Sequence, residues 1–336
     1  MTELLPVHWL VSVLTDPPSD RDAVTRSNLA SVRLRAGALA TVATGVGISF
    51  GDVVSSCPRI LLIGKIGAND LALRSIRWLE SIDRVKRTGG TVVCDYTDHH
   101  LGFESSMTEF YRKALALSDA VVVPSEAMAE LIQPICRLPT FVIPDAIESP
   151  TISPSVPQDS SRSILWFGHG SNLEYLLRWI AEFECSLGRW SLVLRILVDP
   201  HSVERLKQTR LISRMPFKVL VDTWSLGAMI DAARVSDLCI IPSDPSDPKK
   251  RGVSSNRLLT ALSLGLPVGA DRIASYQEFR DFFVDLRSSA FTDLLADPVS
   301  GHQAVRVAQH GILPRFSMLS IGKQWTHFLS RQLPTR

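Results

Sequence analysis

Short apolar runs alternate along the chain with longer segments in which apolar residues recur at helical spacing. The short runs are rich in Val, Ile and Leu and do not alternate with polar residues, which is typical of parallel strands buried on both faces. The predicted strands are residues 7–14, 60–63, 91–94, 120–123, 140–143, 163–167, 192–198, 217–221, 238–241 and 267–270. The predicted helices between them include residues 69–86, 104–117, 172–185 and 202–211. This alternation predicts doubly wound α/β domains.

A stretch of linker composition divides the chain into two halves. Residues 149–162, SPTISPSVPQDSSR, combine prolines with polar residues at nearly every other place. We therefore expect two Rossmann-like domains that face a cleft, the first over residues 1–150 and the second over residues 151–312. The remaining residues, 313–336, contain an amphipathic helix over 316–329, with Ile321, Trp325 and Leu329 at helical spacing.

The composition is that of a globular protein and excludes several classes. Among 336 residues, 45% are hydrophobic and 21% are charged, which rules out a disordered chain or a small disulfide scaffold. The chain has 36 Lys and Arg against 34 Asp and Glu, a formal net charge of +2. This balance gives no reason to expect nucleic-acid binding, so any basic site must be local.

The cysteines and the N-terminal residues suggest a cytoplasmic protein. The 5 cysteines are far apart, form no C-x-x-C pair and lie in or beside apolar runs, as expected of reduced buried thiols. The first residues, MTELLPVHWLVSVLTD, hold an acidic residue and no basic segment, so they do not predict a signal peptide. No apolar run is long enough to cross a bilayer.

The segment with the strongest chemical signal is residues 237–270, DLCIIPSDPSDPKKRGVSSNRLLTALSLGLPVGA. A predicted strand runs into a basic, proline-rich loop, then into a helix with Gly265 beyond its end. Ligands of open parallel sheets bind beyond the carboxyl ends of the strands, where helix N-termini attract anions. The loop and helix start predict a phosphate cradle, or else a solvated loop with capping serines. The candidate residues are Lys249, Lys250, Arg251, Ser254, Ser255, Asn256 and Arg257.

Two further strand ends carry candidate residues. In ILWFGHGSNLEY, a strand runs into a glycine-rich turn that could approach a ligand closely or could be a tight turn with a serine cap. Its candidates are Gly168, His169, Gly170, Ser171 and Asn172. Trp224 follows another strand, and it could stack on a base or pack in the core.

In the first half, one strand ends in VVCDYTDHH, which brings two carboxylates, Asp95 and Asp98, close to two imidazoles, His99 and His100. Asp98, His99 and His100 are therefore candidates for acid–base chemistry near neutral pH, the alternative being capping and surface polarity. No second cluster completes a metal site, so we predict none.

Together these segments resemble GT-B glycosyltransferases that use nucleotide sugars. The resemblance rests on VVVPSE at 121–126, VIPDAIE at 142–148, the strand at 164–168, DLCIIPS at 237–243 and LTALSLGLPVGA at 259–270. It implies that the second domain binds the donor, that the first binds the acceptor, and that the C-terminal helix returns to the first domain. The implied co-substrate is a nucleotide sugar, with no other cofactor and no metal.

One departure from the family pattern concerns the donor motif. Many relatives carry E-x7-E, and here Gly252 and Thr260 stand at those positions. The segment SSNR instead resembles a divergent K-S-x-N-R pattern, in which Asn256 and Arg257 take over donor contacts. The departure keeps a second interpretation open, a degenerate GT-B protein that binds without turnover. A third is another sugar-nucleotide enzyme, such as an epimerase.

The acceptor side is less defined by sequence. Residues 27–35, SNLASVRLR, resemble the segment that lines the acceptor side in this family, so Arg33 and Arg35 could meet an anionic acceptor or could be exposed helix charges. The resemblance implies a glycan, lipid-linked or small-molecule acceptor. Because lipid-linked acceptors are common in such families, peripheral membrane association stays open, and the sequence carries no signal for the oligomeric state.

Overall fold

A computed structural model describes residues 6–12, 24–25, 27, 29–43, 47–54, 56–67, 70–156, 161–187, 190–208 and 215–332. Its contacts divide the chain into two compact units. The first unit comprises Met1–Glu148, Ser246–Ser255 and Arg315–Arg336, and the second comprises Ser149–Pro245 and Asn256–Pro314. The segment Ser246–Ser255, which lies between two elements of the second unit in sequence, therefore belongs to the first by its contacts.

The first unit is built on a six-stranded sheet of order β2-β1-β3-β4-β5-β6. Every neighbouring pair is parallel. Its strands are β1 (Val7–Leu10), β2 (Ile48–Gly51), β3 (Ile60–Ile63), β4 (Thr91–Asp95), β5 (Ala120–Val123) and β6 (Thr140–Val142). Its helices are η1 (Val32–Ala36), α2 (Gly37–Val42), α3 (Leu71–Arg87), α4 (Thr108–Leu117), α5 (Glu126–Ile132), η4 (Pro248–Lys250), α12 (Met318–His327) and η8 (Phe328–Gln332).

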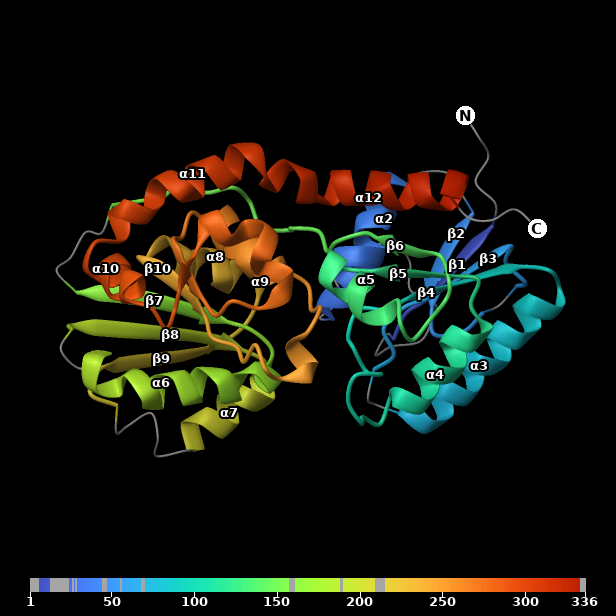
Figure 1. Ribbon diagram of the computed structural model, residues 1–336, viewed down its shortest axis with the longest axis horizontal. Helices are drawn as coiled ribbons and strands as arrows, with labels where there is room; N and C mark the ends of the chain where they lie inside the picture. The colour runs from blue at the N-terminus through green and yellow to red at the C-terminus, as the bar shows by residue number, and fades with distance from the viewer. Residues whose placement is uncertain are drawn as a thin grey trace. The chain divides into compact units, whose positions relative to one another are not determined.

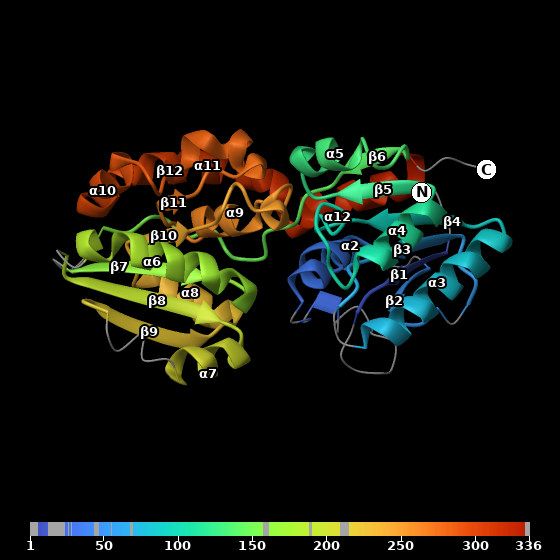
Figure 2. The same ribbon diagram turned by 60° about the horizontal axis from the view of Figure 1, so that its bottom comes forward.

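Helices cover both faces of this sheet, which explains why its strands are apolar without alternation (Figures 1 and 2). Along β3, Ile60 and Leu62 enter one core, while Leu61 and Ile63 enter the other. Residues of α3, α4 and α5 close the second core. The first core is closed by α2 and by the C-terminal helices α12 and η8.

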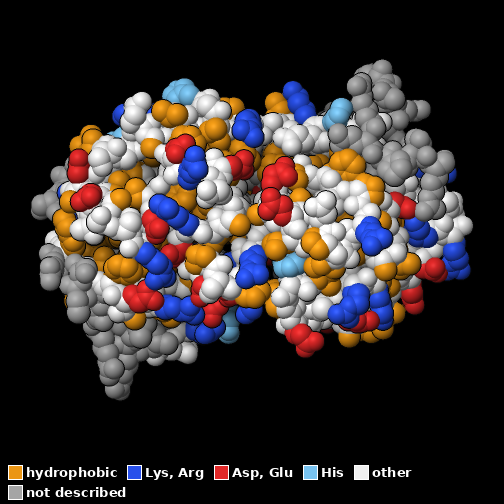
Figure 3. Space-filling view, viewed as in Figure 1, with side chains coloured by type: hydrophobic (Ala, Val, Ile, Leu, Met, Phe, Trp, Pro, Cys, Tyr) orange, Lys and Arg blue, Asp and Glu red, His pale blue; other side chains and the backbone are white. Residues whose placement is uncertain are grey.

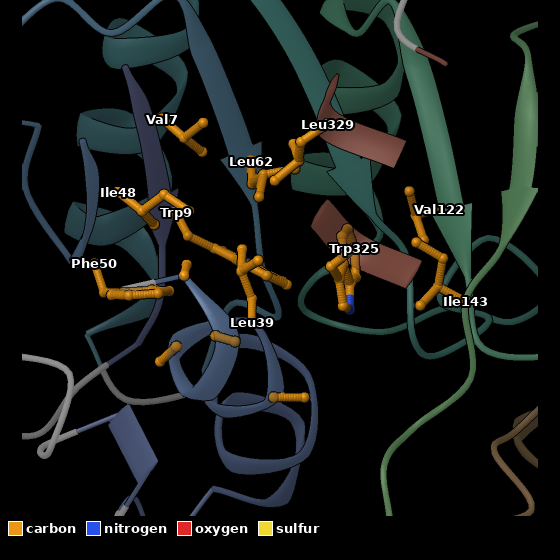
Figure 4. Close-up of a cluster of buried hydrophobic side chains, with 14 of the residues drawn as sticks. Val7, Trp9, Leu39, Ile48, Phe50, Leu62, Val122, Ile143, Trp325 and Leu329 are labelled. Carbon is orange, nitrogen blue, oxygen red and sulfur yellow. The ribbon is translucent and has the colours of Figure 1, made fainter. Parts of the chain in front are cut away.

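The C-terminal helix α12 supplies a central side chain of the first core. Trp325 is fully buried, and its ring centroid lies 4.6 Å from that of Trp9 on β1 (Figure 4). Gly322 lets the helix approach closely, because a Cβ there would lie 2.3 Å from the carbonyl oxygen of Ala38 in α2. The last helix is therefore an integral layer of the first unit.

The second unit repeats the doubly wound plan with a six-stranded sheet of order β12-β11-β10-β7-β8-β9, again with parallel pairs. Its strands are β7 (Arg162–Phe167), β8 (Leu192–Val198), β9 (Lys218–Thr223), β10 (Leu238–Ile241), β11 (Val268–Ala270) and β12 (Val284–Asp285). Its helices are η2 (Gly170–Asn172), α6 (Leu173–Leu187), α7 (Pro200–Gln208), α8 (Leu226–Arg234), α9 (Asn256–Ser263), η5 (Ala274–Phe282), α10 (Ser289–Ala296), η6 (Pro298–Gly301) and α11 (His302–Gly311). Helix α6 lies on one side of the sheet, and α8 and α9 lie on the other (Figure 1).

The predicted α/β class with two Rossmann-like domains is confirmed. The structure contains each predicted strand, with ends shifted by a few residues, and adds the short strands β2 and β12. Three predicted element ends lie outside the described residues. They are residues 13–14 of the first strand, residue 69 of the 69–86 helix and residues 209–211 of the 202–211 helix.

The proline-rich stretch after residue 148 is held against the second unit over its described part, residues 149–156. The amide of Ile152 donates to the carbonyl of Ser263 at 2.8 Å, and the carbonyl of Ile152 accepts from Gln309 at 2.7 Å. Gly265 follows α9 with a φ of +81°, and a Cβ there would lie 2.5 Å from that same carbonyl oxygen. Its predicted place beyond the helix end is confirmed. The missing side chain also leaves room for the backbone of the stretch after residue 148 to pass close by.

The charged side chains on the visible face of each unit alternate in sign, in keeping with the small net charge (Figure 3). Within the part of the chain that the structure describes, no helix is both long and apolar enough to cross a membrane.

A buried guanidinium joins the elements of the first unit. Arg35 has no exposed surface, and it donates to Asp95 at the end of β4, to Asp145 beyond β6 and to the carbonyl of Ile143. Its Cζ also lies 5.3 Å from the ring centroid of Trp325. Burial raises the pKa of Asp95, and the charge of Arg35 opposes that rise. The ion pairs are therefore what keeps a fully buried carboxylate ionised.

Replacing this guanidinium tests its role in stability. We expect Arg35→Met to lower the free energy of unfolding at pH 7 by about 3–5 kcal/mol, because two buried carboxylates lose their counter-charge. The loss should be smaller at pH 5 than at pH 7, because burial raises the pKa of Asp95 and the variant lacks the charge that opposes this rise, so the carboxylate is neutralised more readily as the pH falls. Urea unfolding at both pH values measures this. Arg87→Met, which removes an exposed pair with Asp83, is the control and should cost less than about 0.5 kcal/mol. Equal losses in the two variants would contradict the assignment.

Candidate functional site

The carboxyl end of the first sheet carries an ion pair between two neighbouring strand ends. Lys65 follows β3 and Asp98 follows β4, and their side chains meet at 2.6 Å. About a third of each side chain is exposed, 38% for the lysine and 32% for the aspartate. Burial raises the pKa of Asp98, but the charge of Lys65 outweighs it and the net pKa is lowered. Asp98 is thus ionised and is a weak base at neutral pH.

The two histidines after Asp98 are held by aromatic rings. The His100 ring stacks on Tyr111 with centroids 5.1 Å apart, and its Nδ1 lies 3.1 Å from the Ser105 hydroxyl. The His99 ring meets the edge of Tyr96 at 6.3 Å and lies against Gly102, where a Cβ would be 2.0 Å from its Cδ2. Both imidazoles are therefore fixed in orientation.

Each histidine keeps one ring nitrogen without a partner. Nδ1 of His99 and Nε2 of His100 are buried and make no hydrogen bond with the residues described. Burial lowers the pKa of both rings, and the charge of Arg251 lowers that of His99 further. For His100, Asp98 raises the pKa and Lys65 lowers it. Neutral imidazoles with an unused nitrogen can accept a proton or hold a hydroxyl group.

The basic loop Ser246–Ser255 is fixed to the first unit at the start of α5. Ser125 caps α5 by accepting from the Met128 amide at 3.1 Å, and its hydroxyl donates to the carbonyl of Gly252 at 2.9 Å. Gly252 has a φ of +75°, and a Cβ would lie 2.9 Å from Cα of Met128. Lys249 lies 5.9 Å from the ring centroid of Phe103, in the loop after the histidines. The loop therefore brings its cations to the Asp98–His100 segment.

The second unit carries a partly buried arginine at the start of α9. Arg257 lies over the ring of Trp166 on β7, with Cζ 5.3 Å from the centroid, and faces Gly168, where a Cβ would lie 3.4 Å from that Cζ. Its Nε and Nη2 are buried and make no hydrogen bond with the described residues. Burial lowers the pKa of Arg257, and the nearby Tyr276 and Cys239 offset part of this decrease.

The surroundings of Arg257 contain no ionised partner among the described residues. Burial raises the pKa of Tyr276 to about 12 and that of Cys239 to about 12, so both are neutral at pH 7. A buried cation without a counter-charge is costly, and its unused N–H groups are the donors that bind phosphate or carboxylate oxygens. The arrangement is therefore chemically suited to hold an anion.

The glycine-rich turn after β7 is held by a neighbouring strand end. The amide of Gly170 donates to Asp199 at 2.9 Å, and a Cβ at Gly170 would lie 2.0 Å from the hydroxyl of Ser202. Nδ1 of His169 lies 3.0 Å from the Ser171 hydroxyl. The Gly170 amide is thus already satisfied, while Gly168 is the glycine that adjoins Arg257.

The structure divides the predicted donor residues between the two units. Trp224 follows β9 and is half-buried, with its amide donating to the carbonyl of Val198 at 2.8 Å. The donor candidates in the second unit are Gly168, His169, Gly170, Ser171, Asn172, Trp224, Asn256 and Arg257. Those that group with the first unit are Lys249, Arg251, Ser254 and Ser255.

The two arginines predicted for the acceptor side are both engaged inside the first unit. Arg33 is buried, pairs with Glu148 at 2.5 Å and donates to the carbonyl of Ser27. Arg35 is enclosed by Asp95 and Asp145. They are therefore not exposed helix charges. Neither guanidinium is presented to an acceptor in this structure, because carboxylates from distant segments of the chain pair with each of them.

Sequence reasoning missed two side chains at these sites. Lys65 lies two residues after β3, so inspection of every strand end, rather than of the polar clusters alone, would have found it. The sequence did not single out Trp166, because it lies inside an apolar strand, where a tryptophan is expected to pack in the core. Among the residues described, no group of three or more His, Cys, Asp or Glu side chains is arranged to hold a metal ion.

Solved structures of sugar-transferring enzymes share this architecture. Sucrose-phosphate synthase from Thermosynechococcus elongatus matches with a TM-score of 0.63 and 14% identity, over 97% of this chain and 98% of that one. S. aureus TarM, in complex with fondaparinux, alpha-GlcNAc-glycerol and UDP, matches with a TM-score of 0.55 and 11% identity over 80% of this chain. The lipopolysaccharide outer core galactosyltransferase WaaB matches with a TM-score of 0.52 and 14% identity over 83% of this chain.

These likenesses show that the chain has the GT-B fold of glycosyltransferases. The match spans 55% of the TarM chain and 56% of a chain of the GtfA/B complex, so this chain corresponds to only about half of the length of those proteins. No protein-family model and no curated protein sequence matches the chain.

The lowered histidine pKa values predict a pH dependence of stability. Unfolded histidine takes a proton near pH 6.5, whereas folded His99 and His100 resist it, so stability should fall as the pH drops below about 6.5. Urea unfolding between pH 7.5 and 5.5 measures the slope. A His99→Gln, His100→Gln double variant should show a shallower fall than the unsubstituted protein. An unchanged slope would show that the two rings protonate equally in both states.

Proposed function

We propose that this protein is a glycosyltransferase that moves a sugar from a nucleotide-sugar donor to a hydroxyl group of a glycan, lipid-linked or small-molecule acceptor. The GT-B fold supports the reaction class. The observation that carries the proposal is that Nε and Nη2 of Arg257 are buried and make no hydrogen bond with the residues that the structure describes. Fold alone does not fix chemistry, so the site has to supply the argument.

Arg257 is suited to the leaving group of such a reaction. When the glycosidic bond of a nucleotide sugar breaks, negative charge builds on the phosphate oxygens. A guanidinium that is already desolvated stabilises that charge strongly, because no water has to reorganise around it. Its place in the first turn of α9 adds backbone N–H groups and the positive end of the helix dipole. In this proposal the phosphates lie against Arg257 and Gly168, and fixed cations serve in place of a metal ion.

Asn256 and Trp224 complete the proposed donor site. Asn256 begins α9 beside Arg257, where its amide side chain can orient a phosphate or a ribose. Trp224 stands at the carboxyl end of β9, on the same edge of the sheet, and is placed to stack on a base. His169, Ser171 and Asn172 line the turn after β7 on that edge.

The first unit would present the acceptor hydroxyl to its histidines. His100 is neutral with Nε2 unused, and in this proposal it accepts the hydroxyl proton or orients the hydroxyl. His99 offers Nδ1 for the same purpose. Asp98 is a weaker base because Lys65 holds its pKa down, so we assign it to positioning of Lys65 and His100 rather than to proton transfer.

A second candidate function is binding without turnover. Its support is that Gly252 and Thr260 stand where many GT-B enzymes carry carboxylates, and that Gly252 is committed to contact with Met128. Transfer of a labelled sugar from the matching nucleotide sugar separates the two. Nucleotide affinity with no product across neutral and anionic acceptors would support the binding protein, whereas product would exclude it.

Arg257→Ala tests the donor site directly. The unsubstituted protein should gain thermal stability with one member of a panel of UDP, GDP, ADP, TDP and CMP. The variant should bind that nucleotide more weakly by about 1.5–3 kcal/mol, because a charge-assisted contact is lost. Isothermal titration calorimetry measures both affinities.

Two further variants serve as controls for Arg257. Arg257→Lys keeps the charge and should lose less affinity than the alanine variant. Arg234→Ala removes an exposed cation that pairs with Asp231 in α8, and it should not change nucleotide affinity. A folded Arg257→Ala protein that binds the nucleotide as tightly as the unsubstituted protein would remove Arg257 from the site.

A further inference from the structure

The loop Ser246–Ser255 concentrates positive charge beside the histidines of the first unit. It carries Lys249, Lys250 and Arg251 against a single carboxylate, Asp247. Arg251 is exposed and makes no ion pair with any residue that the structure describes. The charge of Arg251 contributes to lowering the pKa of His99, and the charge of Lys250 contributes to lowering the pKa of Asp98.

The loop is held in place by a specific contact. The Ser125 hydroxyl donates to the Gly252 carbonyl, next in sequence to Arg251, and Gly252 meets Cα of Met128 so closely that no other residue fits. Lys249 at the other end of the run lies over Phe103. A loop that only kept cations in solvent would not need both anchors.

Two unpartnered imidazole nitrogens lie in the segment that these cations reach. His99 is 5% exposed and His100 is 8% exposed, and Nδ1 of the first and Nε2 of the second have no hydrogen-bond partner among the described residues. Buried polar atoms are seldom left without a partner, and those that are often belong to a ligand site. Lys65, paired with Asp98, adds a further ammonium to this edge of the sheet.

We propose that the Lys249–Arg251 loop and Lys65 form a phosphate subsite, and that the acceptor of this protein is a phosphate-bearing compound. The inference rests on the proposed function and names the class of its acceptor. Arginine and lysine donate charge-assisted hydrogen bonds to phosphate oxygens, and several cations suit its double negative charge. A phosphate held by the loop brings the neighbouring hydroxyl groups of the acceptor to His99 and His100.

A titration with inorganic phosphate tests the subsite by itself. The ring signals of His99 and His100 in ¹H–¹⁵N spectra, assigned with His→Gln variants, report binding at this edge of the first sheet only. In the unsubstituted protein, phosphate at constant ionic strength should shift both signals in a saturable way. Arg251→Ala should weaken the apparent phosphate affinity at least about tenfold, the loss of one charge-assisted contact. Arg234→Ala, in the second unit, should leave it unchanged.

The source of the phosphate is distinguished by two further ligands. A hexose 6-phosphate is compared with the same hexose, and vesicles that contain phosphatidylglycerol are compared with pure phosphatidylcholine vesicles. Arg251-dependent binding of the sugar phosphate assigns a soluble acceptor, and Arg251-dependent binding of the anionic vesicles assigns a lipid phosphate. Histidine signals that do not respond to any of these anions, or that respond equally in Arg251→Ala, would overturn the proposal.

Nucleotide binding in the same samples separates this proposal from the proposed function. Arg251→Ala should retain the nucleotide affinity that Arg257→Ala loses. If the nucleotide binds through Arg257 while phosphate leaves the histidines unchanged, the subsite alone is wrong. If phosphate binds through Arg251 while no nucleotide binds, the donor assignment is wrong and the phosphate site stands.

Discussion

The first unit depends on the burial of one guanidinium. Arg35 comes from a helix, yet it satisfies Asp95 at the end of β4 and Asp145 beyond β6, and it lies against Trp325 of the C-terminal helix. None of these charges could be buried without the others, because each alone would carry the full desolvation cost. The pairing therefore fixes the carboxyl edge of the first sheet, which is the edge that carries Lys65 and the histidines.

The two units use cations in opposite ways. In the first, the buried Arg33 and Arg35 pair with carboxylates, and the exposed Arg251 makes no ion pair with any residue that the structure describes. In the second, Arg257 lies over Trp166, and its buried Nε and Nη2 make no hydrogen bond with the described residues. The first arrangement would attract an anion at modest strength through water. In the proposed donor site, the second would hold an anion more strongly, because the two buried N–H groups have already lost their water.

Residues that are neighbours in sequence can belong to different units. Of the residues 249–257 that predict a phosphate cradle, Lys249–Arg251 belong by their contacts to the first unit and Arg257 belongs to the second. The reason is local: Gly252 lies against Met128, and Ser125 holds its carbonyl, so the loop leaves the strand that precedes it. Likewise, the glycine-rich turn looked like a ligand loop, yet Gly170 is required by Asp199 and Ser202.

The class of fold, strands such as β5 and β8, and the place of Gly265 beyond α9 could all be predicted from the sequence. These follow from apolar periodicity and from backbone rules that act over a few residues. The sequence also placed the polar candidates at strand ends. Which charged side chains form ion pairs inside the fold could be seen only once the distant segments of the chain were in place. Arg33, Arg35 and Arg257 look alike in sequence, and they differ because carboxylates distant along the chain reach the first two and none among the described residues reaches the third.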